Sequence, residues 1–399
     1  MALQLYDTRS RAIRPFVAGR TVRLYVCGIT PYDSTHLGHA FTYLAFDVLT
    51  RYLEQLGHRV RSVRNITDVD DDILRKAREL GVDYRELGRR EVARFDRDLD
   101  ALDVRRPDAT PRATETIPAI RMAVGGLLQR GLAYALNDGR VYFDTAAGGR
   151  LSQLSGLDRE KMLAVFAEKG GDPDAPGKRD ALDFLLWQPS GDGEPSWDTD
   201  WGAGRPGWHV ECSVMAAEEL GSVIDIHGGG NDLIFPHHAA ETLQAEGLTG
   251  QAPFANFWLH VGMVALDGVK MSKSLGNLVF VGDLLERFES GAIRRYLLAH
   301  HYRSTWSYDD EGLQEAAAGF KRWRSAAASD VQRPDLAAAF FSALDDDLDT
   351  PTAIQVLDSA AEAGAGRTLR DLAAILGFTL ISDSRASAGA HTHWTSRSR

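Results

Sequence analysis

The segment from residue 21 to residue 66 constrains the fold of this chain more than any other stretch. Residues 21–28 and residues 59–66 each predict a strand. Residues 38–56 predict a helix between them, because apolar side chains recur there at helical spacing, namely Leu44, Val48, Leu49, Tyr52, Leu53 and Leu56. In doubly wound sheets, ligands bind beyond the carboxyl ends of the strands. We therefore expect the loop after the first strand to lie at a nucleotide site.

Two short motifs carry the strongest chemical signal. His36 and His39 stand three positions apart in that first loop, and Lys270 and Lys273 stand three apart in a later loop of small residues. Together the two stretches resemble the HIGH and KMSKS signatures of class I aminoacyl-tRNA synthetases and their relatives. The resemblance implies ATP-driven formation of an acyl-adenylate.

The charge that develops in such a reaction explains these residue types. Attack of a carboxylate on the α-phosphorus of ATP places negative charge on that phosphate and on the departing pyrophosphate, which cations and N–H donors stabilise. We expect His36 and His39 to donate to phosphate oxygens, and Lys270 and Lys273 to lie near the β and γ phosphates. Without the resemblance, a capped helix start and a basic surface turn would explain the same residues.

Composition excludes several other classes of protein. The 399-residue chain is 44% hydrophobic and 25% charged, as in ordinary soluble proteins. It has no apolar run long enough for a transmembrane helix and no signal-peptide pattern at its start. With only two cysteines we expect no disulfide scaffold and a cytoplasmic location. A net charge of −11 argues against a large nucleic-acid footprint.

The expected fold is α/β, with a class I aminoacyl-tRNA synthetase-like Rossmann catalytic domain. We expect three regions: a catalytic domain over residues 1–282 with a helical insertion at about 72–135, a C-terminal helical domain over residues 283–380, and a disordered tail over residues 381–399. Residues 144–206 lack clean periodicity, and residues 208–280 are expected to be strands and turns.

Four residues form a candidate metal site. Cys27 ends the first strand, Cys212 lies far along the chain, and His237 and Glu241 are four apart, so on a helix they share one face. Two thiolates, an imidazole and a carboxylate suit tetrahedral zinc. The spacing is not that of a zinc finger, and from these residues alone buried cysteines and a satisfied histidine are the favoured interpretation.

A resemblance to cysteinyl-tRNA synthetase reverses that preference. It covers about residues 1–315 and is carried by residues 25–30, residues 208–212, residues 225–230 and the pair His237–His238. It implies one zinc ion per chain that binds the substrate cysteine thiolate, since serine lacks a soft ligand atom. Cys27, Cys212 and His237 would be ligands, with Glu241 or the substrate sulfur in the fourth position. ATP would be a substrate, with Mg²⁺.

The same resemblance implies a set of contacts to the cysteinyl-adenylate and ATP. These residues are Cys27, Gly28, Ile29, Thr30, Thr42, Asn65, Ile66, Thr67, Trp208, Gly230, Asn231, Asp232 and Val264. Asp232 could accept from ribose hydroxyls or from an ammonium group. Trp208 could close a small pocket, or be a plain core aromatic.

Several features are more similar to the cysteine ligase family of mycothiol biosynthesis, which shares this catalytic core. Pro31 and Phe41 stand where the synthetase usually has valine and arginine, and residues 168–173 resemble the Glu-Arg-Gly-Gly-Asp-Pro signature of the ligase, with lysine for arginine. Only 125 residues follow Ser274, whereas the synthetase needs more for its anticodon-binding module. Two residues depart from the ligase pattern: Ala239 replaces a usual glutamate, and Glu241 matches the synthetase.

The resemblance therefore implies transfer of activated cysteine to the amine of a glucosaminyl-inositol. L-cysteine, ATP and a small amine would be the partners of a monomer, with no tRNA and no membrane. A cysteinyl-tRNA synthetase, a paralogue that uses another small amine, and a non-catalytic cysteine sensor are the alternatives. The presence of His36, His39, Lys270 and Lys273 argues against the sensor.

Overall fold

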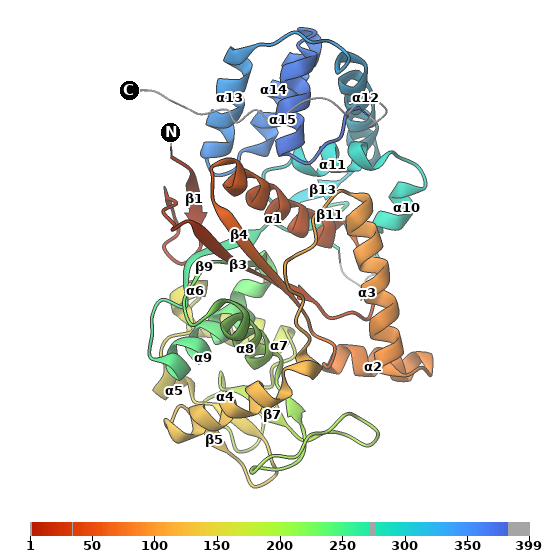
Figure 1. Ribbon diagram of the computed structural model, residues 1–399. Coiled ribbons are helices and arrows are strands. Elements are labelled where there is room, and N and C mark those ends of the chain that lie inside the picture. The colour runs from red at the N-terminus through yellow and green to blue at the C-terminus, as the bar shows by residue number, and fades with distance from the viewer. Residues whose placement is uncertain (1, 34, 272–275, 382–399) are drawn as a thin grey trace.

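The computed structural model describes residues 2–33, 35–271 and 276–381, and a parallel four-stranded sheet lies at its centre (Figure 1). The strand order is β10-β9-β3-β4, with bounds Ala255–Val261, Ile224–Gly230, Thr21–Ile29 and Arg59–Ile66. Helix α1 (Leu37–Gln55) joins β3 to β4. The predicted strand–helix–strand unit is thus confirmed to within about one residue at each end.

Helices cover both faces of this sheet. Helix α1 packs on one face, while α8 (Trp208–Leu220) and α9 (Ala239–Thr249) lie on the other side of the sheet (Figure 1). The expectation of strands and turns over residues 208–280 was therefore wrong for these two helices. Most residues of α8 and the first seven of α9 are buried, so neither helix shows the one-sided apolar stripe from which a helix is predicted.

The chain between β4 and α8 forms a second lobe. Its helices include α2 (Asp71–Leu80), α3 (Tyr84–Ala101) and α4 (Ile117–Gln129), in line with the helical insertion expected there. An antiparallel sheet follows, with strands β5 (Ala133–Ala135), β6 (Val141–Phe143), β7 (Phe184–Gln188) and β8 (Arg205–Pro206). Three short helices lie between β6 and β7, namely α5 (Thr145–Gly148), α6 (Ser152–Ser155) and α7 (Arg159–Glu168). Such short elements explain the lack of periodicity over residues 144–206.

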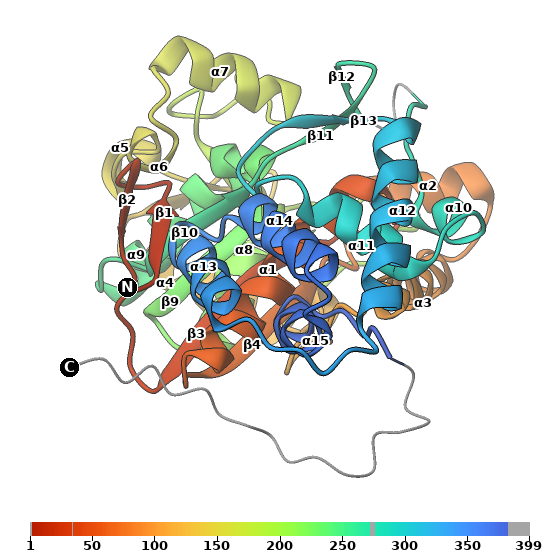
Figure 2. The same ribbon diagram turned by 90° about the horizontal axis from the view of Figure 1, so that it is seen from above.

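The C-terminal third is helical, as predicted for residues 283–380, and stacks over α1 (Figures 1 and 2). Its helices are α10 (Val281–Leu285), α11 (Ser290–Leu298), α12 (Asp310–Ala326), α13 (Pro334–Asp345), α14 (Thr350–Glu362) and α15 (Gly366–Ile375). A small sheet of β11 (Val264–Leu266), β12 (Val269–Lys270) and β13 (Trp306–Tyr308) precedes and interrupts them, and a hairpin of β1 (Gln4–Asp7) and β2 (Ala12–Pro15) begins the chain.

Some predicted features cannot be placed. Lys273, the side chain of Lys270 and the predicted tail from residue 382 onward lie outside the described residues. Among the helices that are described, none is long and apolar enough to cross a bilayer.

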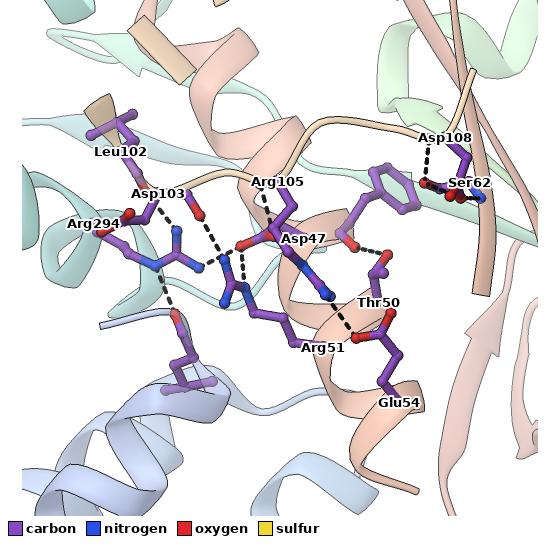
Figure 3. Close-up of polar contacts among 12 residues, drawn as sticks. Asp47, Thr50, Arg51, Glu54, Ser62, Leu102, Asp103, Arg105, Asp108 and Arg294 are labelled. Carbon is purple, nitrogen blue, oxygen red and sulfur yellow. Dashed lines mark hydrogen bonds and ion pairs between the residues drawn. The ribbon is translucent and has the colours of Figure 1, made fainter. Parts of the chain in front are cut away.

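A buried ion pair joins helix α1, the end of α3 and the C-terminal helices (Figure 3). The guanidinium of Arg294 on α11 donates to the carboxylate of Asp47 on α1 at 2.5 Å, and both side chains are 1% exposed. Arg294 also donates to the backbone oxygens of Leu102, just after α3, and Leu376, just after α15, each at 2.6 Å. Burial alone would raise the pKa of Asp47, but Arg294 and Arg51 outweigh it and hold that pKa below its usual value.

We expect Asp47→Ala to destabilise the protein by about 3–5 kcal/mol, because it leaves the Arg294 charge buried without its partner. Glu54→Ala is the matched control, because Glu54 lies on the same helix as Asp47. This variant removes an exposed ion pair with Arg105 and should cost less than about 1 kcal/mol. Urea unfolding of the two variants measures the difference. Equal losses would show that the buried pair has no special role.

Candidate functional site

A cavity of about 810 Å³ opens at the carboxyl ends of β3 and β4, where the sequence placed the nucleotide site. Eleven of the predicted site residues line it: Cys27, Gly28, Ile29, Thr30, His39, Asn65, Thr67, Trp208, Cys212, Asp232 and His237. Parallel strands end at one edge of a sheet, so residues after β3 and β4 meet there although they are some forty positions apart.

Other predicted contact residues lie away from the cavity wall. Thr42 donates its hydroxyl to the backbone oxygen of Gly38 at 3.0 Å within α1. Ile66 is buried at the end of β4, and Val264 is buried in β11. Gly230 and Asn231 directly precede Asp232, which does line the cavity.

Gly28 brings two strands into very close contact. Its N–H donates to the side-chain oxygen of Asn65 at 2.7 Å, and the Asn65 amide donates to the hydroxyl of Thr67 at 3.2 Å. A Cβ atom on Gly28 would lie 1.6 Å from the backbone oxygen of Asn65. Only glycine therefore allows this part of the cavity floor to form.

The two histidines of the first motif lie at the N-terminus of α1. His36 is the N-cap, and its Nδ1 accepts from the backbone N–H groups of Gly38 at 3.1 Å and His39 at 3.4 Å. The rings of His36 and His39 stack with centroids 3.7 Å apart. The capped helix start is thus present, and a helix N-terminus also favours bound phosphate. His39 lines the cavity, whereas His36, which caps the helix, is not among the lining residues.

The four predicted metal ligands meet at the inner end of the cavity. Ligand atoms of Cys27, Cys212, His237 and Glu241 all lie within 4.8 Å of one another, and all four residues are buried. His237 Nε2 is 3.1 Å from Glu241 Oε1, and Cys27 Sγ is 3.5 Å from the same oxygen. This set could hold one metal ion.

The electrostatics of this cluster favour a bound cation. Burial raises the pKa of the Cys27 thiol, and Cys212 and Glu241 raise it further. Burial likewise raises the pKa of Glu241 and lowers that of His237, so the imidazole is neutral and able to act as a ligand. The Cys27 thiol and the Glu241 carboxyl group are costly to ionise in a dry interior unless a cation compensates them.

More histidines surround the cluster, and the sequence analysis assigned them no role. His227 Nε2 lies 2.8 Å from Glu241 Oε2, and His209 Nδ1 lies 2.9 Å from His237 Nδ1. His238 Nε2 lies 3.3 Å from Cys27 Sγ, and its Nδ1 lies 2.7 Å from His260 Nε2. Cys27, His227, His238 and Glu241 form a second possible ligand set. Such contacts orient metal ligands.

No spacing pattern in the sequence pointed to these surrounding histidines as a cluster. They come from α8, β9, the turn before α9 and β10, and their mutual contacts exist only after the sheet has formed. Their one visible trace was the family-like stretch around His227 and the adjacent pair His237–His238.

Trp208 and Asp232 both line the cavity. The Trp208 ring stacks on His237 with centroids 4.2 Å apart, so it packs directly over a metal-ligand candidate. Lys169, in the turn after α7, lies 3.8 Å from the carboxylate of Asp232. This contact links the second lobe to the central sheet beside the cavity.

Known proteins resemble this chain in sequence and in fold. Residues 14–318 match the family model described as tRNA synthetases class I (C) catalytic domain. A Thermomonospora curvata protein named L-cysteine:1D-myo-inositol 2-amino-2-deoxy-alpha-D-glucopyranoside ligase is 48% identical over 380 residues, which cover 94% of this chain and 91% of that protein. A Gordonia bronchialis protein with the same name is 50% identical over 365 residues, which cover 90% and 88%.

A solved structure agrees with the expected fold class. Mycobacterium tuberculosis methionyl-tRNA synthetase in complex with methionyl-adenylate superposes with a TM-score of 0.63 at 18% identity, and 90% of each chain is covered. At this identity the likeness concerns the fold alone, and it confirms the synthetase-like α/β architecture.

We expect Gly28→Ala to destabilise the protein by at least about 1–3 kcal/mol and to disrupt the cavity floor, because the new methyl group would overlap Asn65. Gly19→Ala is the matched control, since a Cβ there would meet no atom within 4 Å. Thermal unfolding of both variants tests this, and a Gly28→Ala protein as stable as the control would contradict it.

Proposed function

This chain belongs to the family of class I tRNA synthetase (C) catalytic domains, and from that premise we propose that it is an ATP-dependent cysteine ligase. It activates L-cysteine as cysteinyl-adenylate and transfers it to the amine of a glucosaminyl-inositol. The names of relatives that are 46–50% identical over about nine-tenths of the chain support this acceptor.

One observation carries the proposal: a thiol-binding metal-ligand set and a phosphate-binding helix start open on the same cavity. Cys27, Cys212 and His237 line its inner end, and His39 lines it at the N-terminus of α1. A cysteine whose sulfur lies at the first group can direct its carboxylate toward an ATP α-phosphate held by the second. That arrangement suits adenylation of cysteine in particular.

We assign the inner cluster to zinc, one ion per chain. Cys27, Cys212 and His237 hold it, with Glu241 or the substrate sulfur as the fourth ligand. When bound, zinc supplies a soft Lewis acid that prefers a thiolate to a hydroxyl, which separates cysteine from serine. The two free, buried cysteines support a reducing compartment, and so a cytoplasmic location.

The remaining residues act on ATP and on the adenylate. His36 and His39 donate N–H groups to phosphate oxygens, and Lys270 and Lys273 neutralise the β and γ phosphates, with Mg²⁺ accompanying ATP. Thr30, Asn65, Thr67 and Asp232 line the cavity and bind the adenylate, and Trp208 closes the cysteine end. The remaining predicted contact residues shape this surface. Gly28 and Ile29 line the cavity, and the others lie beside or behind its wall, namely Thr42, Ile66, Gly230, Asn231 and Val264.

The acceptor is a small amine, and tRNA is not a substrate. The decisive experiment incubates the enzyme with ATP and L-cysteine and either glucosaminyl-inositol or tRNA, and identifies the cysteinylated product by mass. We expect the amide of glucosaminyl-inositol. Efficient charging of tRNA, which weakens steeply with salt as phosphate contacts require, would favour a cysteinyl-tRNA synthetase instead.

Cys212→Ser should lose zinc and, with it, the preference for cysteine over serine, because a hydroxyl is a much poorer zinc ligand than a thiolate. Metal analysis after dialysis should give about one zinc per wild-type chain and far less for the variant. Ser213→Ala is the control, since it alters the next residue of α8 and should retain the metal. A well-folded, active wild type without zinc would contradict this assignment.

A further inference from the structure

One part of the cavity wall is formed by the N-terminus of α2. Asp70 is the N-cap, with its carboxylate accepting from the backbone N–H of Asp72 at 2.7 Å. Asp70, Asp71 and Asp72 all line the cavity. This wall carries charge that neither the ATP phosphates nor the cysteine thiolate would favour, so it suits a cationic partner.

Neighbouring residues hold this helix start firmly in place. Arg205 of β8, which is 5% exposed, contacts the carboxylate of Asp71 and lies 3.2 Å from that of Glu194. Arg75 donates to Asp72 at 2.6 Å. Asp71 and Asp72 are therefore each paired with an arginine, whereas Asp70 caps the helix.

A second buried carboxyl group interacts electrostatically with Asp70. Glu211 on α8 is 0% exposed, and neither of its carboxyl oxygens has a hydrogen-bond partner among the described residues. Burial raises the pKa of Glu211, and Asp70, Cys212 and Asp68 raise it further. Asp70 thus lines the cavity and also interacts with a buried acid.

This environment makes Asp70 an unusually basic carboxylate. Burial is the main cause that raises its pKa to about 6, and the charges of Asp72 and Asp71 add to it, while the backbone N–H of Asp72 and the guanidinium of Arg205 oppose it. At neutral pH the group is ionised, yet it accepts a proton more readily than an ordinary aspartate.

We propose that Asp70 is the general base of the transfer step and removes a proton from the ammonium group of the acceptor. The inference rests on the proposed function, because it requires an amine acceptor that binds as its cation. Asp70 is then a catalytic residue that the sequence analysis did not single out.

The acceptor ammonium gives one proton to the Asp70 carboxylate, and the neutral amine attacks the carbonyl carbon of cysteinyl-adenylate. The new C–N bond forms, and the bond from the carbonyl carbon to the phosphate oxygen breaks, with its electron pair leaving on AMP. The nitrogen loses its second surplus proton to the departing phosphate, and Asp70 later returns its proton to solvent.

Four other carboxylates of the cavity already have partners. Asp71 and Asp72 are paired with arginines, and Asp232 lies beside Lys169. Asp183 accepts hydrogen bonds from Tyr134, from Asp180 and twice from Thr145. These partners hold the four carboxylates in place, whereas the Asp70 carboxylate accepts the backbone N–H of Asp72 that caps the helix.

Asp70→Asn tests the proposal, because asparagine caps a helix as well as aspartate does but cannot take the proton. Asp83→Asn is the matched control: Asp83 caps α3 in the same way, accepting from the N–H groups of Arg85 and Glu86, and it does not line the cavity. We expect both variants to exchange pyrophosphate into ATP like the wild type. Single-turnover transfer from preformed adenylate to glucosaminyl-inositol should fall about 100-fold at pH 7 in Asp70→Asn alone.

Two further measurements separate a base from a merely structural residue. Wild-type transfer should rise with pH through a midpoint near 6 and then level off, and in Asp70→Asn that midpoint should move up to the pKa of the acceptor ammonium. Hydroxylamine, which is largely unprotonated at neutral pH, should be used equally well by both proteins. Glucosamine serves as a parallel ammonium acceptor.

The outcomes are distinguishable. Two results would overturn the role of Asp70. One is transfer by Asp70→Asn to either ammonium acceptor as fast as by the wild type. The other is loss of pyrophosphate exchange and hydroxylamine transfer in the same variant. A wild type that uses glucosamine but not glucosaminyl-inositol overturns the proposed acceptor, and the defect of the variant with glucosamine still supports Asp70.

Discussion

The ion pair between Asp47 and Arg294 is the interaction on which the arrangement of this molecule depends. It lies in the interior, and Arg294 also satisfies the backbone after α3 and after α15, so three regions far apart in sequence meet at one guanidinium. Helix α1 begins with the two motif histidines and carries Asp47 in its middle. The position of those histidines is therefore coupled to the C-terminal helices, because the hydrogen bonds of such a polar network strengthen one another.

The chemical character of the cavity wall differs between the metal-ligand cluster and α2. At the inner end, thiols, neutral imidazoles and a carboxyl group lie in a dry interior that favours a soft cation. Toward α2 the wall becomes ionic, with aspartates held by Arg75 and Arg205. A two-step ligase needs both surroundings, because the thiol must be selected in the first step and an ammonium must lose its proton in the second.

The fold alone does not choose the acceptor. A methionyl-tRNA synthetase shares this architecture at 18% identity, and one fold can serve different substrates. The choice must come from side chains on the cavity wall, among which are Asp70 and Lys169 of the turn after α7. Lys169 also lies 3.8 Å from the carboxylate of Asp232, directly after β9 of the central sheet.

The sequence by itself determined the strand–helix–strand unit and the helical C-terminal third, because periodicity is a local property. It misassigned α8 and α9, since helices buried on most sides show no apolar stripe. The family resemblance suggested the set Cys27, Cys212, His237 and Glu241, but only the tertiary structure brings their ligand atoms within 4.8 Å of one another. It also decided which histidines surround them and that Arg294 reaches Asp47. These contacts join residues from 14 to 247 positions apart, and long-range packing, which no local pattern records, creates them.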